Sequence, residues 1–173
     1  ATAVAKTDVT ADLPLPLNVG IGFAYSGIEN LLITGDVALS QWSAWDVIEV
    51  NDDDGNKINE LTMNWEDGIR AGLALEYSLA LANAKLRASF YSEPAAPVAE
   101  TMNPTIPDIN RRNVVVLGFG LPVGPFEAGL MYEHMFIGDK TVEWSPETPP
   151  FHNLGGLYTM TVNNIMFGLD YNF

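Results

Sequence analysis

The charged side chains that could do chemistry in this chain recur on alternate positions of three segments. Alternate positions of a β-strand lie on one face, so these side chains are predicted to meet on one face of a sheet. The cations could hold the carboxylate of a bound ligand, or they could neutralise the carboxylates beside them. The second interpretation is favoured, because charges enclosed in a protein wall are normally paired. The residues with this parity are Arg70, Glu76, Lys85, Arg87, Glu127 and Glu133, with Met131 among them.

The acidic segment NDDDGNKINE, residues 51–60, suggests a calcium loop. An EF-hand needs oxygen ligands at its first, third and fifth positions, just before the glycine. Counting back from Gly55, these positions hold Asp54, Asp52 and Val50, and the valine breaks the pattern. An exposed acidic turn is the favoured interpretation, and calcium bridging to lipopolysaccharide is the alternative.

The histidines His134 and His152 have no metal-ligand partner at useful spacing. A Ser–His–Asp hydrolase would need a serine beside His134, and residues 112–136 contain none. No enzyme activity, no metal and no cofactor are therefore expected.

The elements that position these side chains are segments in which every second residue is apolar. Such alternation predicts strands, and each segment has about the 9–11 residues that a tilted strand needs to cross a bilayer. The alternate positions that hold the apolar residues have almost no charged residue. The positions between them hold glycines, serines and the charged residues, as expected where side chains meet inside the crowded lumen of a barrel. The segments are 17–26, 31–40, 68–78, 84–91, 113–121, 126–136 and 160–173.

The connections alternate between short and long. Short ones are predicted at 26–30, 79–83 and 122–125, and long ones at about 41–66, 92–111 and 137–158. Outer-membrane barrels have short periplasmic turns and long external loops, so the pattern favours such a barrel with a periplasmic C-terminus. Aromatic residues near the strand ends are predicted to form two interfacial girdles. The outer girdle comprises Trp42, Trp45, Trp65 and Phe136, and the inner one Tyr25, Tyr77, Tyr171 and Phe173.

The composition excludes several classes of protein. With 22 acidic residues against 8 Lys and Arg, the chain has a net charge of −14, which argues against nucleic acid as a partner. The absence of cysteine excludes disulfides. No run of about 18 apolar residues predicts a transmembrane helix, and the first residues do not resemble a signal peptide.

Several segments resemble the FadL family of outer-membrane proteins that transport hydrophobic compounds. The similar stretches are LPLPLNVGIGFAYSGIENLLITGDVALSQWSAW with its "WSxW", NWEDGIRAGLALEY, KLRASFYSEPAAP, NPTIPDINR with its "IPDxxR", and the closing NIMFGLDYNF. The resemblance covers nearly the whole chain. It implies an all-β, antiparallel transmembrane barrel of fourteen strands plugged by an N-terminal hatch. Residues 1–173 would be its C-terminal portion of about seven strands, without the hatch and the first strands.

The resemblance further implies passive uptake of long-chain fatty acids or of aromatic or aliphatic hydrocarbons. Fatty-acid members of the family carry a basic residue shortly before the strand that begins here near Asp67. The matching ELTMNW has none, and the nearest cation is Lys57, which leaves room for a neutral hydrocarbon. The alternative function is a general porin-like or structural barrel with a water-filled lumen.

The expected location is the outer membrane of a Gram-negative bacterium, with hydrophobic small molecules, membrane lipid and lipopolysaccharide as partners. Seven strands cannot close a barrel of this kind, and open edges in lipid are costly. We therefore expect a fragment or a split half, closed by the missing N-terminal half or by a partner chain. Candidates for an external apolar groove are Met102, Ile106, Ile109, Leu154, Leu157 and Met160.

Overall fold

A large antiparallel sheet dominates the protein, seen here in a computed structural model that describes residues 8–101, 108, 110–144 and 155–171. Its order is β12-β9-β8-β7-β6-β3-β2, so strands adjacent in the sheet follow one another along the chain apart from the short loop strands. The bounds are β2 (Asn18–Ile28), β3 (Leu31–Ser40), β6 (Gly68–Ser78), β7 (Lys85–Glu93), β8 (Arg112–Val123), β9 (Phe126–Ile137) and β12 (Thr161–Tyr171). All seven predicted strands are confirmed, within a few residues at each end.

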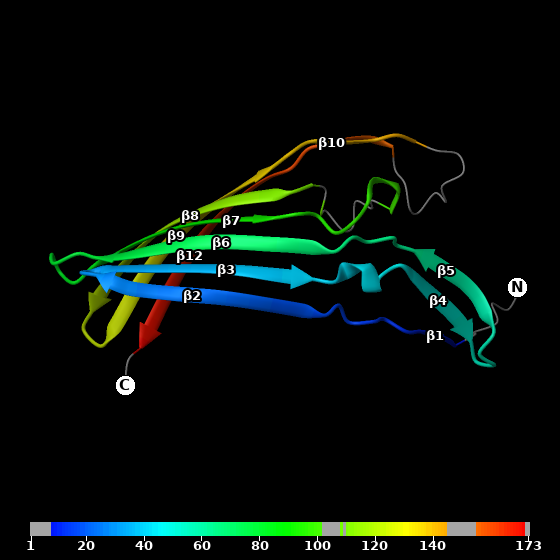
Figure 1. Ribbon diagram of the computed structural model, residues 1–173, viewed down its shortest axis with the longest axis horizontal. Helices are drawn as coiled ribbons and strands as arrows, with labels where there is room; N and C mark the ends of the chain where they lie inside the picture. The colour runs from blue at the N-terminus through cyan, green and yellow to red at the C-terminus, as the bar shows by residue number, and fades with distance from the viewer. Residues whose placement is uncertain (1–7, 102–107, 109, 145–154, 172–173) are drawn as a thin grey trace, which may run out of the picture.

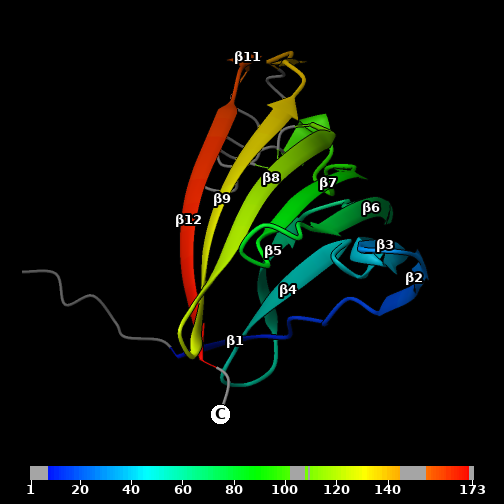
Figure 2. The same cartoon turned by 90° about the vertical axis from the view of Figure 1, so that its left-hand side faces the viewer.

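The sheet is curved like a trough and does not close (Figure 2), with β2 and β12 at its two edges. Exposure alternates along the inner strands: in β6, Leu73 is 49% exposed, while its neighbours Gly72 and Ala74 are partly shielded. The shielded parity faces the concave side. The other parity forms the convex face, and in these seven strands it contains no Asp, Glu, Lys or Arg.

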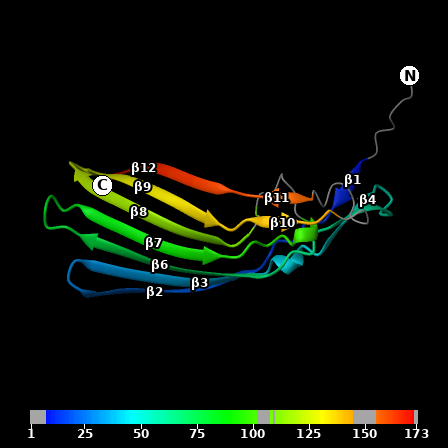
Figure 3. The same ribbon diagram turned by 90° about the horizontal axis from the view of Figure 1, so that it is seen from above.

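The predicted alternation of connections is confirmed. Tight turns lie at one end of the sheet and the long connections at the other (Figure 3). The turn between β2 and β3 has Asn30 at φ 62°, and the turn between β8 and β9 has Gly124 at φ 62°. Asparagine and glycine adopt this left-handed conformation more readily than other residues, which is why the chain can reverse there within two residues.

The long connections contain short strands that the sequence did not predict. In the first, β4 (Val47–Asp52) and β5 (Lys57–Thr62) form a sheet with β1 (Val9–Ala11), visible at the right of Figure 1. In the last, β10 (Lys140–Val142) pairs with β11 (Gly156–Tyr158). Two single-turn 3₁₀ helices, η1 (Trp42–Ala44) and η2 (Ala99–Thr101), complete the described elements. No helix in the described part of the chain is long and apolar enough to span a membrane.

Three tryptophans form a cluster: Trp42 and Trp45 follow β3, and Trp65 precedes β6. Trp65 is buried in this cluster, so its predicted place in an outer aromatic girdle is wrong. The ring of Trp65 lies 5.3 Å from that of Trp42 and 4.7 Å from that of Trp45, and only 9% of Trp65 is exposed. The indole of Trp45 donates a hydrogen bond of 2.7 Å to the carbonyl of Pro14. These contacts therefore hold together the segment before β2, the segment after β3 and the segment before β6.

Candidate functional site

An ion-pair network crosses the concave face at Arg87, on β7. Arg87 Nε donates to Glu76 Oε2 on β6, and Arg87 Nη2 donates to Glu127 Oε1 on β9, both at 2.7 Å. Lys85 Nζ donates to the other oxygen, Glu127 Oε2, at 2.8 Å. Two carboxylates and two cations therefore satisfy one another, and we refer to these four residues as the Arg87 network.

Glycines on β8 allow this network to reach across a whole strand. Arg87 is paired with Gly118 in the ladder and bonds to Glu127 beyond it. A Cβ added at Gly120 would lie 3.0 Å from both Arg87 Nη1 and Glu127 Oε1. A side chain at this position would therefore crowd the guanidinium and the carboxylate that it holds.

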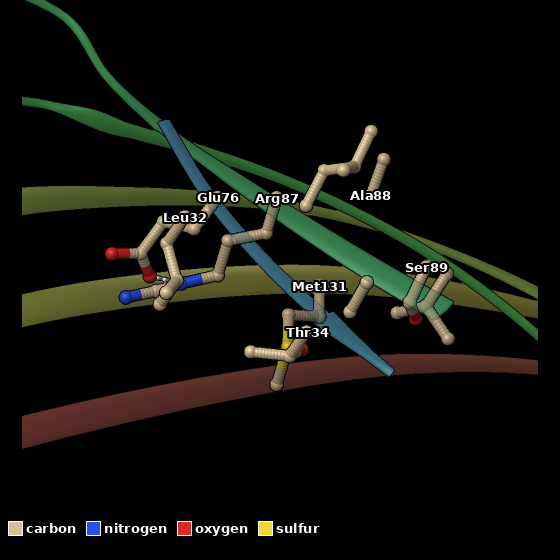
Figure 4. A pocket seen from close by; sticks show the side chains of 10 residues that line it. Leu32, Thr34, Glu76, Arg87, Ala88, Ser89 and Met131 are labelled. Atoms are coloured by element: carbon tan, nitrogen blue, oxygen red, sulfur yellow. Dashed lines mark hydrogen bonds and ion pairs between the residues drawn. The ribbon is translucent and has the colours of Figure 1, made fainter. Parts of the chain in front are cut away.

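A pocket of about 250 Å³ adjoins the Arg87 network on the concave face. Figure 4 shows Thr34, Met131 and Arg87 directed to one side of the sheet and Ala88 directed to the opposite side. Most of the wall is apolar or weakly polar, and the charged atoms of Glu76 and Arg87 are already engaged with each other. The side chains on this pocket, called the concave pocket below, include Leu32, Thr34, Glu76, Arg87, Ser89, Val116 and Met131.

The structure brings together five of the seven predicted lumen residues: Glu76, Lys85, Arg87, Glu127 and Met131. The other two lie on the same face but outside both the Arg87 network and the pocket. Arg70 Nη1 lies 3.4 Å from Asp36 Oδ2, and its guanidinium carbon lies 4.8 Å from the centre of the Tyr91 ring. Glu133 Oε1 accepts a hydrogen bond of 2.7 Å from Asn164 Nδ2.

Leu32, Thr34, Ser89 and Val116 also line the pocket, and no sequence motif singled them out. Each shares the parity of the charged residues of its strand or of the neighbouring strand, and this is the signal that could have found them. Ladder pairing places Thr34 opposite Ala74, Ala74 opposite Ser89, and Ser89 opposite Val116. Their convergence depends on register, which alternation within one segment does not reveal.

Two of the proposed external-groove residues lie within the described residues. Leu157 is 67% exposed on β11, whereas Met160 packs against the buried Val142 of β10 together with Ile137. The remaining candidates, Met102, Ile106, Ile109 and Leu154, lie outside the described residues, as do His152 and Phe173.

Outside the strands of the large sheet, hydrogen bonds and burial change the pKa values of several carboxyl groups. Hydrogen bonds from Asn56 hold the pKa of Asp52 below its ordinary value, in a turn of the acidic segment. Burial raises the pKa of Asp108, although Arg112 opposes this shift. Within the described ranges, no three His, Cys, Asp or Glu side chains are grouped so that they could hold a metal ion.

His134 lies on the convex face of β9, near the end of the strand that leads into the last long connection. Its Nδ1 is 2.7 Å from Asn163 Oδ1 on β12, and the Tyr132 hydroxyl donates to the same oxygen at 2.7 Å. The ring of His134 also lies 4.3 Å from that of Phe136. The histidine therefore ties the edge strand to its neighbour.

The fold is the curved, single-layered wall of an antiparallel β-barrel, with an apolar outer face and a charged inner face. It is similar to the crystal structure of a FadL homologue from Pseudomonas aeruginosa, with a TM-score of 0.77 and 16% sequence identity over 93% of this chain. The chain spans 36% of the length of that protein. No protein-family model and no curated protein sequence matches the chain.

Proposed function

We propose that the chain forms part of the wall of an outer-membrane channel through which hydrophobic molecules enter by passive diffusion. The observation that carries this proposal is the contrast between the two faces of one sheet. Ile21, Ile165 and Phe167 on the convex face are 78%, 78% and 74% exposed, which suits contact with lipid. The concave face holds neutralised charges beside a largely apolar pocket, which suits an uncharged cargo.

The likeness to a FadL homologue supports the same function at the level of the fold. In this proposal the C-terminus faces the periplasm, the long connections face outward, and further strands or a partner chain pair with β2 and β12. Membrane lipid and lipopolysaccharide surround the convex face. No covalent chemistry is part of the mechanism.

The cations on the concave face are already paired with carboxylates of the protein, which favours neutral hydrocarbons over fatty acids as the cargo. Arg87 and Lys85 already hold carboxylates of the protein, so a cargo carboxylate would have to displace Glu76 or Glu127. Displacing either one would leave a partly shielded carboxylate unpaired, which is costly. A neutral molecule fills the concave pocket without breaking an ion pair.

The proposal is tested by uptake into bacteria that produce the protein in their outer membrane. We expect faster uptake of radiolabelled ethylbenzene than in cells without the protein, and no change in the uptake of labelled arabinose. Ser89→Phe, which fills the concave pocket, should remove most of the gain. Ala71→Phe is the matched control, because Ala71 lies on the convex face of β6 and does not line the concave pocket.

Faster uptake of arabinose would favour the porin-like alternative. Equal uptake of ethylbenzene by cells with Ser89→Phe and cells with the unchanged protein would show that cargo does not pass the concave pocket. Surface labelling and immunoblotting of outer-membrane fractions verify that each variant reaches the membrane in equal amount.

A further inference from the structure

The convex face of the large sheet carries polar side chains at one end of four neighbouring strands. They lie on β7, β8, β9 and β12, near the strand ends that lead into the long connections. Every other convex position in the seven strands holds an apolar residue, glycine, alanine or tyrosine. Ladder pairing places Ser92 opposite Asn113, Asn113 and Thr161 on either side of one residue of β9, and His134 opposite Asn163. We call these residues the convex polar band: Ser92, Asn113, His134, Thr161 and Asn163.

The convex polar band does not continue across the other half of the sheet. The ladder row that holds Ser92 and Asn113 runs on through Ala71, Val37 and Ile21 in β6, β3 and β2. A general boundary with water would place polar residues at the ends of all seven strands. The restriction to four strands therefore indicates a local binding surface.

Arg111, directly before β8, adds a cation to this surface. Its Nη1 donates a hydrogen bond of 3.1 Å to the hydroxyl of Ser92, which places the guanidinium beside the convex polar band. Arg111 forms no ion pair with a carboxylate of the described residues, although Glu66 and Glu100 border a cavity together with it. A guanidinium has five N–H donors, so most of them remain for a ligand.

The amides of the convex polar band supply neutral donors. Asn163 Oδ1 lies 2.7 Å from both the Tyr132 hydroxyl and His134 Nδ1, whereas its Nδ2 has no hydrogen-bond partner among the described residues. From Ser92 to Thr161 the band crosses three inter-strand steps of about 4.8 Å each, about 14 Å in all. This length exceeds that of a single phosphate ion and suits a sugar that carries phosphate.

We propose that Arg111 and the convex polar band bind the phosphorylated sugar headgroup of lipopolysaccharide. Arg111 and the Ser92 hydroxyl donate to a phosphate, and hydrogen bonds between ionised groups are stronger than neutral ones. The amides of Asn113 and Asn163 donate to sugar oxygens, while the acyl chains lie on the apolar part of the convex face. This proposal deepens the proposed function, on which it rests for the contact of the convex face with lipid and for the outward direction of the long connections.

Native mass spectrometry tests the proposal on the protein purified in detergent from outer membranes, together with the strands or partner chain that close it. The probes are lipid A, the phosphorylated membrane anchor of lipopolysaccharide, and dephosphorylated lipid A with the same acyl chains. We expect tighter binding of lipid A. Arg111→Gln should weaken the binding of lipid A about tenfold, because it removes a charge-assisted hydrogen bond, and should leave the dephosphorylated lipid unaffected. Arg111→Lys, which keeps the charge but loses the planar fork, should bind with intermediate affinity.

Lys57→Gln is the matched control, because it removes the same charge from β5, outside the large sheet. Equal binding of the two lipids, or an equal loss in Lys57→Gln and Arg111→Gln, would overturn the proposal. Displacement of lipid A by an excess of inorganic phosphate would also overturn it, because the site would then belong to a free anion. A preference for lipid A in a protein that fails to take up hydrocarbon would instead refute the proposed function and leave the lipid site intact.

Discussion

Gly120 is the residue on which the geometry of the Arg87 network depends. We expect Gly120→Val to displace Arg87 from Glu127 and to lower stability by about 1–3 kcal/mol, the usual cost of overpacking. The matched control is Gly168→Val, also on the concave parity of a strand, where an added Cβ meets no atom within 4 Å. The temperature at which the folded band is lost in gel electrophoresis measures the effect, and equal melting of both variants would contradict it.

Protonation of Asp67 at low pH should weaken its contact with Ser43 at the end of the large sheet. Hydrogen bonds from the Ser43 side chain and from its backbone N–H, at 2.9 Å, hold the pKa of Asp67 below its ordinary value of 3.8. A lowered folded pKa means that the stabilisation is present above pH 3.8 and is lost as the pH falls through the folded pKa. Fluorescence of the neighbouring Trp42 should therefore change in that window, and Asp67→Asn should remove this transition.

At the scale of elements, the tryptophan cluster lies in the segments that connect the three-stranded sheet to the large one. Trp45→Phe removes the hydrogen bond to Pro14 but keeps most of the ring contact, so we expect a loss of about 1 kcal/mol and faster amide exchange in β1. Trp42→Phe is the control, since the structure shows no indole hydrogen bond for Trp42 within the described residues. Equal exchange in the two variants would mean that ring packing alone holds β1.

At the scale of the whole molecule, the two faces of the sheet should meet different media. The chain has no cysteine, so Leu73→Cys and Ala74→Cys introduce single thiols on the convex and concave faces of β6. In intact membranes we expect a charged maleimide to leave Leu73→Cys unreacted, and we expect both thiols to react once the protein is denatured. Labelling of both before denaturation would show that the convex face is in water, and would contradict the membrane location.

The two open edges of the large sheet also concern the molecule as a whole. β2 and β12 each have one neighbour in the sheet, and hydrogen-bonding groups along their outer sides need partners wherever lipid surrounds them. The likeness to a protein of which this chain spans 36% of the length fits closure by further strands. In our proposal these strands complete a barrel around the concave pocket.

The sequence by itself determined the seven long strands, their faces and the alternation of their connections. These features are local: side chains alternate along any strand, so the parity of Leu73 or Arg87 follows from the position in the segment. The sequence also placed Glu76, Arg87, Glu127 and Met131 on one face of the sheet. The resemblance to the FadL family predicted a fold that the comparison with a solved structure supports.

Only the tertiary structure decided which of these side chains meet. The pairing of Arg87 with Glu76 and Glu127 depends on the register of four strands, and a slip of one residue would turn the side chains of a strand to the other face. The burial of Trp65 depends on rings brought together across the first long connection, and β1 pairs with β4 from nearly forty residues away. Such contacts join residues distant in the sequence, so no local pattern could reveal them.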